Sequence, residues 1–212
     1  LDSYKFIRSY FNVLERYAES TPPTEILIRI SKKNKVNPDS MVYFIERYSK
    51  IEDPVKIEAI LSTLRIDKVT RIYCDLRIIS SRNQPEGLSG IYTEILSLDP
   101  GTAKDGDVEA KNFGKMIGEA INIAHYENDD EEVLKFVHHF NLDDEFNYNI
   151  TSSYIRSLTK LGDYGEVENI LEKFKHNFSD IRRWTFMIEI GKIEDVRAEM
   201  EVFEIGVLQS PS

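Results

Sequence analysis

The sequence predicts an all-α protein built from helical hairpins, and two observations carry this prediction. Apolar residues recur at the i, i+3, i+4, i+7 spacing of a buried helical stripe along most of the chain. In the segment 153–174, two such stripes are separated by Gly162 and Asp163. Because glycine commonly ends a helix in the left-handed conformation, this segment is predicted to be two helices joined at Gly162.

The elements before this hairpin follow from the same stripes and from helix-start residues. One helix is expected from Tyr4 to about residue 19, and a second from Thr24, whose side chain is a suitable N-cap. A third begins after Asp39 or Ser40. Residues 25–31 alone have strand-like composition, and their flanks fit a helix equally well.

Five apolar positions of the central hairpin recur elsewhere in the chain. In the central hairpin they are Ile155, Leu158, Val167, Ile170 and Phe174. The copy 34 residues upstream consists of Ile121, Ala124, Val133, Phe136 and Phe140. Two earlier copies consist of Leu76, Ile79, Leu88, Ile91 and Ile95, and of Ile45, Tyr48, Ile57, Ile60 and Leu64. Asn128 takes the place of Gly162 in the first of these copies.

A further copy lies 29 residues downstream of the central hairpin. It matches Gly191 to Gly162, Val196 to Val167 and Phe203 to Phe174. Glu199 falls where an apolar residue is expected, which is typical of a terminal repeat.

The recurrence predicts a helical-hairpin repeat array, that is, an α-solenoid; an irregular helical bundle is the alternative, since any hairpin protein aligns partly with itself. The Pro, Gly and Asp residues of 97–111 indicate a loop or an insertion. We therefore expect N-terminal hairpins in 1–96, C-terminal repeats in 112–205 and a tail in 206–212.

Composition narrows the possible functions. The net charge of -10 argues against a general polyanion binder, because Lys and Arg dominate affinity for phosphates. The single cysteine, Cys74, favours a reducing compartment. No apolar run approaches the roughly 20 residues of a membrane span. The first residue is not Met, and we expect a mature or excised segment of a longer chain.

Residues 148–180 resemble a pentatricopeptide repeat. The resemblance rests on the apolar pair Ile155 and Leu158, on the turn Lys160-x-Gly162, and on a closing stripe and acid: Leu171, Phe174 and Asp180. One unit matches well and the others mainly in apolar positions. Tetratricopeptide repeats, also of 34 residues, are the rival, but their small residues and closing Pro are not visible in this unit.

This resemblance implies binding of single-stranded RNA, typically in mitochondria or chloroplasts, with one base read per repeat. We expect the mitochondrial matrix. The implied reader residues of the best unit are Ser152 and Asp180, and the first reader position falls on Gly118, Tyr73 and Val42 in the earlier units. Gly118 and Val42 have no side chain that can hydrogen-bond a base. Arg156 and Arg77 are the expected basic contacts.

Several other residues are of types that can bind a metal ion, stack on a base or catalyse a reaction. The acidic run 125–136 is interpreted as the start of a helix rather than as a metal site, because acidic side chains favour a helix N-terminus. The adjacent His138 and His139 point apart on a helix. Trp184 is interpreted as a core residue rather than a base-stacking one. No nucleophile elbow or phosphate-loop motif occurs, so an enzyme is not expected, nor a cofactor, metal or small-molecule substrate.

The sequence thus predicts a non-enzymatic helical-repeat protein that binds single-stranded RNA or a partner in RNA processing or translation. The alternative is a tetratricopeptide-like scaffold that binds another protein.

Overall fold

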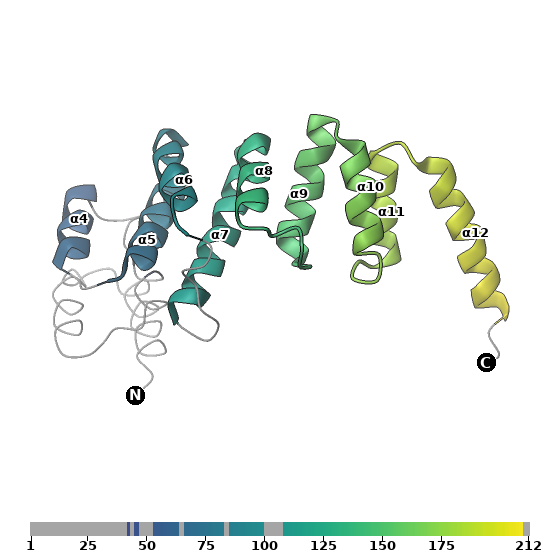
Figure 1. Ribbon diagram of the computed structural model, residues 1–212, viewed down its shortest axis with the longest axis horizontal. Coiled ribbons are helices and arrows are strands. Elements are labelled where there is room, and N and C mark those ends of the chain that lie inside the picture. The colour runs from purple at the N-terminus through teal and green to yellow at the C-terminus, as the bar shows by residue number, and fades with distance from the viewer. Residues whose placement is uncertain are drawn as a thin grey trace, which may run out of the picture. The chain divides into compact units, whose positions relative to one another are not determined.

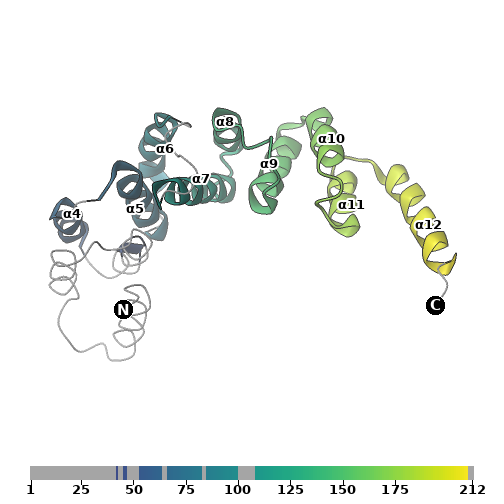
Figure 2. The same cartoon turned by 60° about the horizontal axis from the view of Figure 1, so that its bottom comes forward.

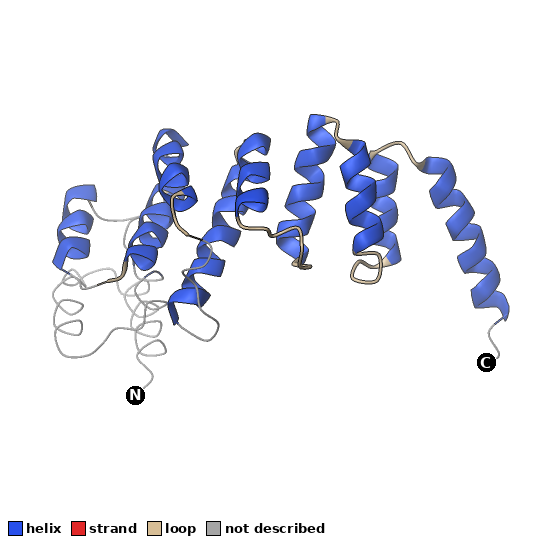
Figure 3. Ribbon diagram, in the orientation of Figure 1, coloured by secondary structure: helices blue, strands red, loops and turns tan. Residues whose placement is uncertain are grey.

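The structure is a computed structural model that describes residues 42, 45–46, 53–63, 66–82, 85–99 and 108–209; the side chains of 56, 60, 63, 108–112 and 203–209 lie outside that description. All regular structure in these residues is helical, which confirms the predicted all-α class (Figure 3). The helices predicted between Tyr4 and residue 31 lie outside the described residues. We use the helix labels of Figure 1.

The chain divides into two compact units, residues 1–120 and residues 121–212. Unit 1 contains α4 (Pro54–Thr63), α5 (Lys68–Ser81), the 3-10 turn η1 (Pro85–Gly87), α6 (Leu88–Leu96) and most of α7 (Val108–Tyr126). Unit 2 contains the end of α7 and then α8 (Asp130–His139), α9 (Tyr148–Leu161), α10 (Tyr164–Lys173), α11 (Asp180–Glu189) and α12 (Ile193–Gln209).

The start of α7 and the end of α12 differ from the bounds of the predicted segments. Helix α7 begins at Val108, inside the predicted loop 97–111, and α12 continues to Gln209, past the predicted end of the repeats at 205. Residues 100–107 are outside the described part. The division into 1–96, 97–111, 112–205 and 206–212 stays a prediction.

In unit 1, helix α5 packs against α6. Asp67 caps α5, since its side chain accepts a hydrogen bond from the Thr70 backbone at 2.7 Å. Gly87 precedes α6 where a Cβ would come within 2.7 Å of Ile79 Cδ1, so a larger residue there would require the Ile79 side chain to shift. Leu76 and Ile95 are fully buried in the resulting core, as their place in the apolar stripes predicts.

In unit 2, helix α9 packs against both α8 and α10, and α11 packs against α12. Figure 2 shows α8 and α10 along one edge of the unit and α9 and α11 along the other. Burial on both sides explains why α9 has a long buried sequence, 150–155 followed by Ser157 and Leu158. The predicted stripes form the core: Ile155, Leu158, Val167 and Ile170 are at most 3% exposed.

Aromatic rings connect the second hairpin of unit 2 to the third. Phe178, between α10 and α11, lies with its ring centroid 5.0 Å from that of Phe146 and 5.8 Å from that of Phe186. Phe146 also lies 5.5 Å from Phe174. Edge-to-face rings at these separations add to the apolar burial, so successive hairpins share one core.

The turns that join α7 to α8, α9 to α10 and α11 to α12 have the same backbone geometry. Asn128, Gly162 and Gly191 have φ values of 60°, 81° and 85°, in the left-handed region. In each turn the following residue donates to a carbonyl five residues back, the bond of a Schellman cap: Asp129 to Ala124, Asp163 to Leu158 and Lys192 to Met187, at 2.9 to 3.0 Å. Gly162 is therefore the joint that its sequence predicts.

The next helix then starts in the same way in two of these turns. Asp129 accepts a hydrogen bond from the Glu132 backbone, and Asp163 from the Glu166 backbone. The acidic residues of the run 125–136 lie in the turn after α7 and in the first turn of α8, as interpreted from the sequence. Among the described residues, none of the helices is long and apolar enough to cross a membrane.

Candidate nucleic-acid interface

The three reader and contact residues predicted in unit 2 lie on α9 and α11. Arg156 is exposed on α9, and Asp180 is exposed as the first residue of α11. Ser152 is only 7% exposed, and its hydroxyl is buried without a hydrogen-bond partner in the described part of the chain. The Ser152 hydroxyl is thus covered, whereas the side chains of Arg156 and Asp180 reach solvent.

The two residues predicted in unit 1 lie on α5. Tyr73 is half-buried there. The Arg77 guanidinium pairs with two carboxylates, Glu46 at 2.6 Å and Glu119. Because both of these partners are only about a quarter exposed, the charge of Arg77 is largely neutralised within unit 1.

A groove of about 550 Å³ opens at the C-terminal ends of α7, α9 and α11. Its lining residues are His125, Tyr126, Asn128, Arg156, Thr159, Lys160 and Glu189. One predicted residue, Arg156, therefore lies in a groove whose other members come from three successive first helices of the hairpins.

The two cations of this groove differ in their hydrogen bonds and ion pairs. Lys160 donates to Asn128 Oδ1 at 3.0 Å, and its ammonium lies 3.4 Å from Asp130 Oδ1. Arg156 has no ion pair within the described residues. Its guanidinium is a fork of donors on an exposed helix face, which suits recognition of a phosphate or carboxylate.

His125 contributes a neutral ring. Burial lowers its pKa, and the positive charges of Lys160 and Arg156 lower it further. Its Nδ1 lies 4.0 Å from Asp130 Oδ1, beyond hydrogen-bond distance, and is buried without a hydrogen-bond partner among the residues described. At neutral pH the imidazole therefore offers a hydrogen-bonding edge rather than a charge.

Asp130 lies next to the groove, and its carboxylate already accepts hydrogen bonds within unit 2. Its Oδ1 accepts from the Ser157 hydroxyl at 2.7 Å as well as from Lys160. Its side chain is only 11% exposed. The carboxylate therefore holds α8 against α9 and presents little negative charge to solvent.

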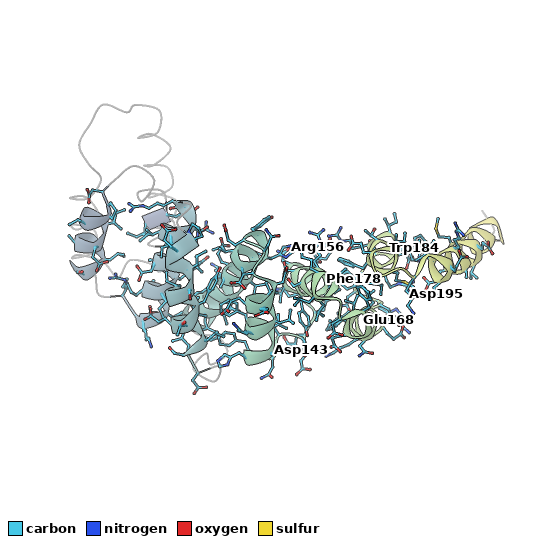
Figure 4. All side chains as sticks on the ribbon, turned by 90° about the horizontal axis from the view of Figure 1, so that it is seen from above. Asp143, Arg156, Glu168, Phe178, Trp184 and Asp195 are labelled. Atoms are coloured by element: carbon cyan, nitrogen blue, oxygen red, sulfur yellow. The ribbon has the colours of Figure 1, made fainter. Side chains whose placement is uncertain are left out.

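Two acidic residues of unit 2, Asp143 and Glu168, lie on the edge opposite the groove (Figure 4). Figure 4 shows Arg156 and Trp184 along one edge and Asp143 and Glu168 along the opposite one. There, Lys173 donates to the Asp143 carbonyl and approaches Asp144, while Glu168 pairs with Lys192 at 3.1 Å. The groove on the first-helix edge therefore combines two cations, Arg156 and Lys160, with one exposed carboxylate, that of Glu189.

A second groove, of about 480 Å³, lies on the face of α11 and α12 that none of the described helices covers. Its lining residues are Asp180, Arg183, Trp184, Ala198, Glu199 and Val202. Glu199 accepts from Arg183 at 2.9 Å and from the Trp184 indole at 2.8 Å. Trp184 is half-buried and hydrogen-bonded rather than fully buried in the core.

The remaining interpreted residues have structural contacts. His138 forms a 2.8 Å hydrogen bond with the Tyr154 hydroxyl, and His139 packs edge-on against Phe140. Arg182 stacks over the rings of Tyr148 and Phe186. In the described part of the chain, no group of three or more His, Cys, Asp or Glu side chains is placed to hold a metal ion.

Sequence reasoning missed most of the groove, although a signal for it exists. The offsets of 34 and 29 residues that align the apolar stripes also align Tyr126, Lys160 and Glu189 with one another. All three stand two residues before the left-handed turn residue of their hairpin. An alignment of the apolar positions alone does not point to this polar position.

Searches of the chain against protein-family models, curated proteins and solved structures found no match.

Proposed function

We propose that this chain is a non-enzymatic helical-repeat protein that binds single-stranded RNA along the first-helix edge of unit 2. The observation that carries the proposal is the groove at the ends of α7, α9 and α11, where exposed Arg156 and Lys160 lie with exposed Tyr126. Cations that neutralise phosphates, placed beside aromatic rings on which bases stack, are the combination that single-strand binders use.

Recurring turn and core positions in unit 2 support this proposal. The left-handed turn residues at 128, 162 and 191 recur at the offsets of the apolar stripes, and so do the buried valines Val133, Val167 and Val196. Each of these valines donates its backbone N–H to the residue four positions earlier. An array of this kind presents equivalent positions of successive hairpins in a row, which suits a linear polymer.

The charges around the groove are compatible with an RNA strand. The acidic residues Asp143 and Glu168 lie on the edge opposite Arg156 (Figure 4), and Asp130, next to the groove, accepts hydrogen bonds from Ser157 and Lys160. A polyanion that enters the groove therefore meets Arg156, Lys160 and one exposed carboxylate, that of Glu189.

The alternative is a tetratricopeptide-like scaffold, and the open face of α11 and α12 favours it. Val202 is 70% exposed there, beside the groove that contains Trp184. An amphipathic helix of another protein could cover such a face. The proposed place of action, mitochondrial RNA processing or translation, rests on the resemblance to pentatricopeptide repeats alone.

Salt-dependent binding tests the RNA proposal. Fluorescence anisotropy with a labelled twelve-nucleotide single-stranded RNA should give an affinity that falls with salt, because binding releases counterions. The variant Arg156→Ala with Lys160→Ala should weaken binding and reduce the log–log salt slope by about 1.4, that is, about 0.7 for each of the two charges.

The matched control removes a cation from another part of unit 2. Lys175 is exposed in the segment after α10 and pairs with Glu172 rather than lining the groove. The Lys175→Ala variant should retain the wild-type affinity and slope. Absence of binding even at low salt, for a chain that is helical by circular dichroism, would rule out the RNA proposal for these residues.

A further inference from the structure

The groove of unit 2 presents one equivalent side chain from each of three successive hairpins. Tyr126 ends α7, Lys160 lies in the last turn of α9, and Glu189 ends α11. An aromatic ring, a cation and an anion thus occupy the same repeat position. A row of this kind can contact successive parts of a linear ligand by three different interactions.

Helix stability explains Lys160, a cation in the last turn of α9, but not the other two residues of the row. Carbonyl groups at a helix C-terminus carry partial negative charge, so a carboxylate in the last turn is unfavourable there. Glu189 is nevertheless exposed at the end of α11 and has no ion pair within the described residues. Tyr126, at the end of α7, is 81% exposed. Neither side chain is placed where it would stabilise its own helix.

Arg156 and Glu189 line the same groove, yet no salt bridge joins them. Both the guanidinium donors and the carboxylate acceptors are therefore available to a ligand. A simple anion would satisfy Arg156 and be repelled by Glu189. The groove suits a ligand that carries phosphates beside a hydrogen-bond donor edge, and a nucleotide strand has both.

We propose that this row selects guanine in a single-stranded RNA, an inference that rests on the proposed function. Tyr126 stacks on one base, Arg156 and Lys160 bind the phosphates, and the Glu189 carboxylate accepts hydrogen bonds from the Watson–Crick edge of a following base. Guanine is the RNA base with two adjacent donors, N1–H and the N2 amino group, which match the two oxygens of a carboxylate.

The residues of this row differ from the reader residues that the resemblance implies. Ser152, in the middle of α9, is covered and only 7% exposed, whereas Glu189, Lys160 and Tyr126 are all exposed at helix ends. The proposed selection therefore depends on the C-terminal ends of the first helices.

The test compares labelled twelve-nucleotide RNAs that are all uridine or carry one central guanine, adenine or cytosine, bound to the full chain and followed by anisotropy. The guanine RNA should bind at least about fivefold more tightly than the others, as expected for a bidentate base contact. Glu189→Gln should remove this preference and leave the affinity for oligouridine equal or higher, because a negative charge is lost.

Two further variants test whether the guanine preference depends on the position of the carboxylate and on stacking. Glu145→Gln changes an exposed carboxylate in the segment between α8 and α9, outside the groove, and should keep the guanine preference. Tyr126→Ala should weaken binding of all four RNAs by about fivefold or more without changing their ratios, because stacking is tolerant of sequence.

The outcomes separate this inference from the proposed function. A guanine preference that survives Glu189→Gln overturns the inference. Equal, salt-dependent binding of all four RNAs, lost when Arg156 and Lys160 are replaced, overturns the guanine selection and leaves RNA binding standing. If none of the RNAs binds, the proposed function itself fails.

Discussion

The hairpins α9–α10 and α11–α12 share a turn but differ in the residues at one equivalent pair of positions. In the first hairpin the pair is Ile155 and Ile170, both almost fully buried between helices. In the second it is Trp184 and Glu199, which are half-buried and joined by a hydrogen bond. Arg183 also donates to Glu199.

This difference shows how one backbone geometry serves two surroundings. Apolar side chains fill the position where other helices cover the hairpin. A hydrogen-bonded polar pair occupies the same position in the hairpin that none of the described helices covers. Exposed apolar area would be unfavourable there, whereas paired polar groups remain compatible with water. Glu199, which interrupts the apolar stripe, is thus accounted for by its partners.

The largest expected effect comes from a charge in the core of α9–α10. Leu158 is 1% exposed, so Leu158→Asp should lower the free energy of unfolding by at least about 4 kcal/mol, because a buried carboxylate would lack a partner. Thermal melts followed by circular dichroism measure the loss. The matched control is Leu161→Asp on the same helix, where the side chain is 47% exposed and the cost should be small.

Truncation of the equivalent positions tests the comparison directly. Ile170→Ala should cost about 2–4 kcal/mol, because it leaves a cavity in the core. Glu199→Ala should cost about 1–2 kcal/mol, the loss of charge-assisted hydrogen bonds at a half-exposed site. Urea unfolding gives both values. Equal costs would mean that the two hairpins are packed alike.

Replacing two nearby glycines by alanine should change the free energy of unfolding by smaller amounts and in opposite directions. Gly162 has φ 81°, so Gly162→Ala should cost about 1–2 kcal/mol through backbone strain alone, since open space surrounds its Cβ position. Gly165 lies within α10, also in open space, and Gly165→Ala should gain about 0.5–1 kcal/mol. In urea titrations, a gain of stability from Gly162→Ala would contradict the left-handed turn, and a loss from Gly165→Ala would contradict the helical position of Gly165.

The smallest expected effect is a dependence of the second hairpin on pH. The hydrogen bond from Arg183 lowers the pKa of Glu199 below its ordinary value. A carboxyl group with a lowered pKa stabilises the fold above the unfolded pKa of about 4.3, and this contribution is lost as pH falls through the folded pKa. Because Glu199 is 37% exposed, the change should stay below about 1 kcal/mol.

Trp184 offers a local measurement of this effect, since it is the only tryptophan and bonds Glu199 directly. Its fluorescence during urea unfolding at pH 3 and at pH 7, wild type against Glu199→Gln, isolates the contribution. The variant should lose part of the pH dependence that the wild type has. An identical dependence in the two proteins would assign it to other carboxylates.

For the candidate site, the sequence led to Arg156 but not to most of its neighbours. Arg156 stands out as an exposed cation on a helix whose apolar stripe is unambiguous. Tyr126 and Glu189 come from helices about 30 residues away on either side, and an alignment of apolar positions says nothing about polar ones. Ser152 was predicted as a reader from its repeat position, whereas burial depends on neighbouring helices that local pattern does not describe.

The sequence by itself determined the helices of the hairpins and their joints. Stripe spacing follows from the helical repeat of 3.6 residues, and the left-handed conformation is open to glycine and, less readily, to asparagine, so both signals are local. Asp129 and Asp163 as helix caps belong to the same local chemistry.

Only the tertiary structure decided which polar side chains are free. Arg77 and Arg156 are both arginines on first helices, yet Arg77 is neutralised by Glu46 and Glu119 while Arg156 is not paired with any described carboxylate. The reason is physical: an ion pair depends on distances between residues that are far apart in the chain, and packing of the helices sets those distances.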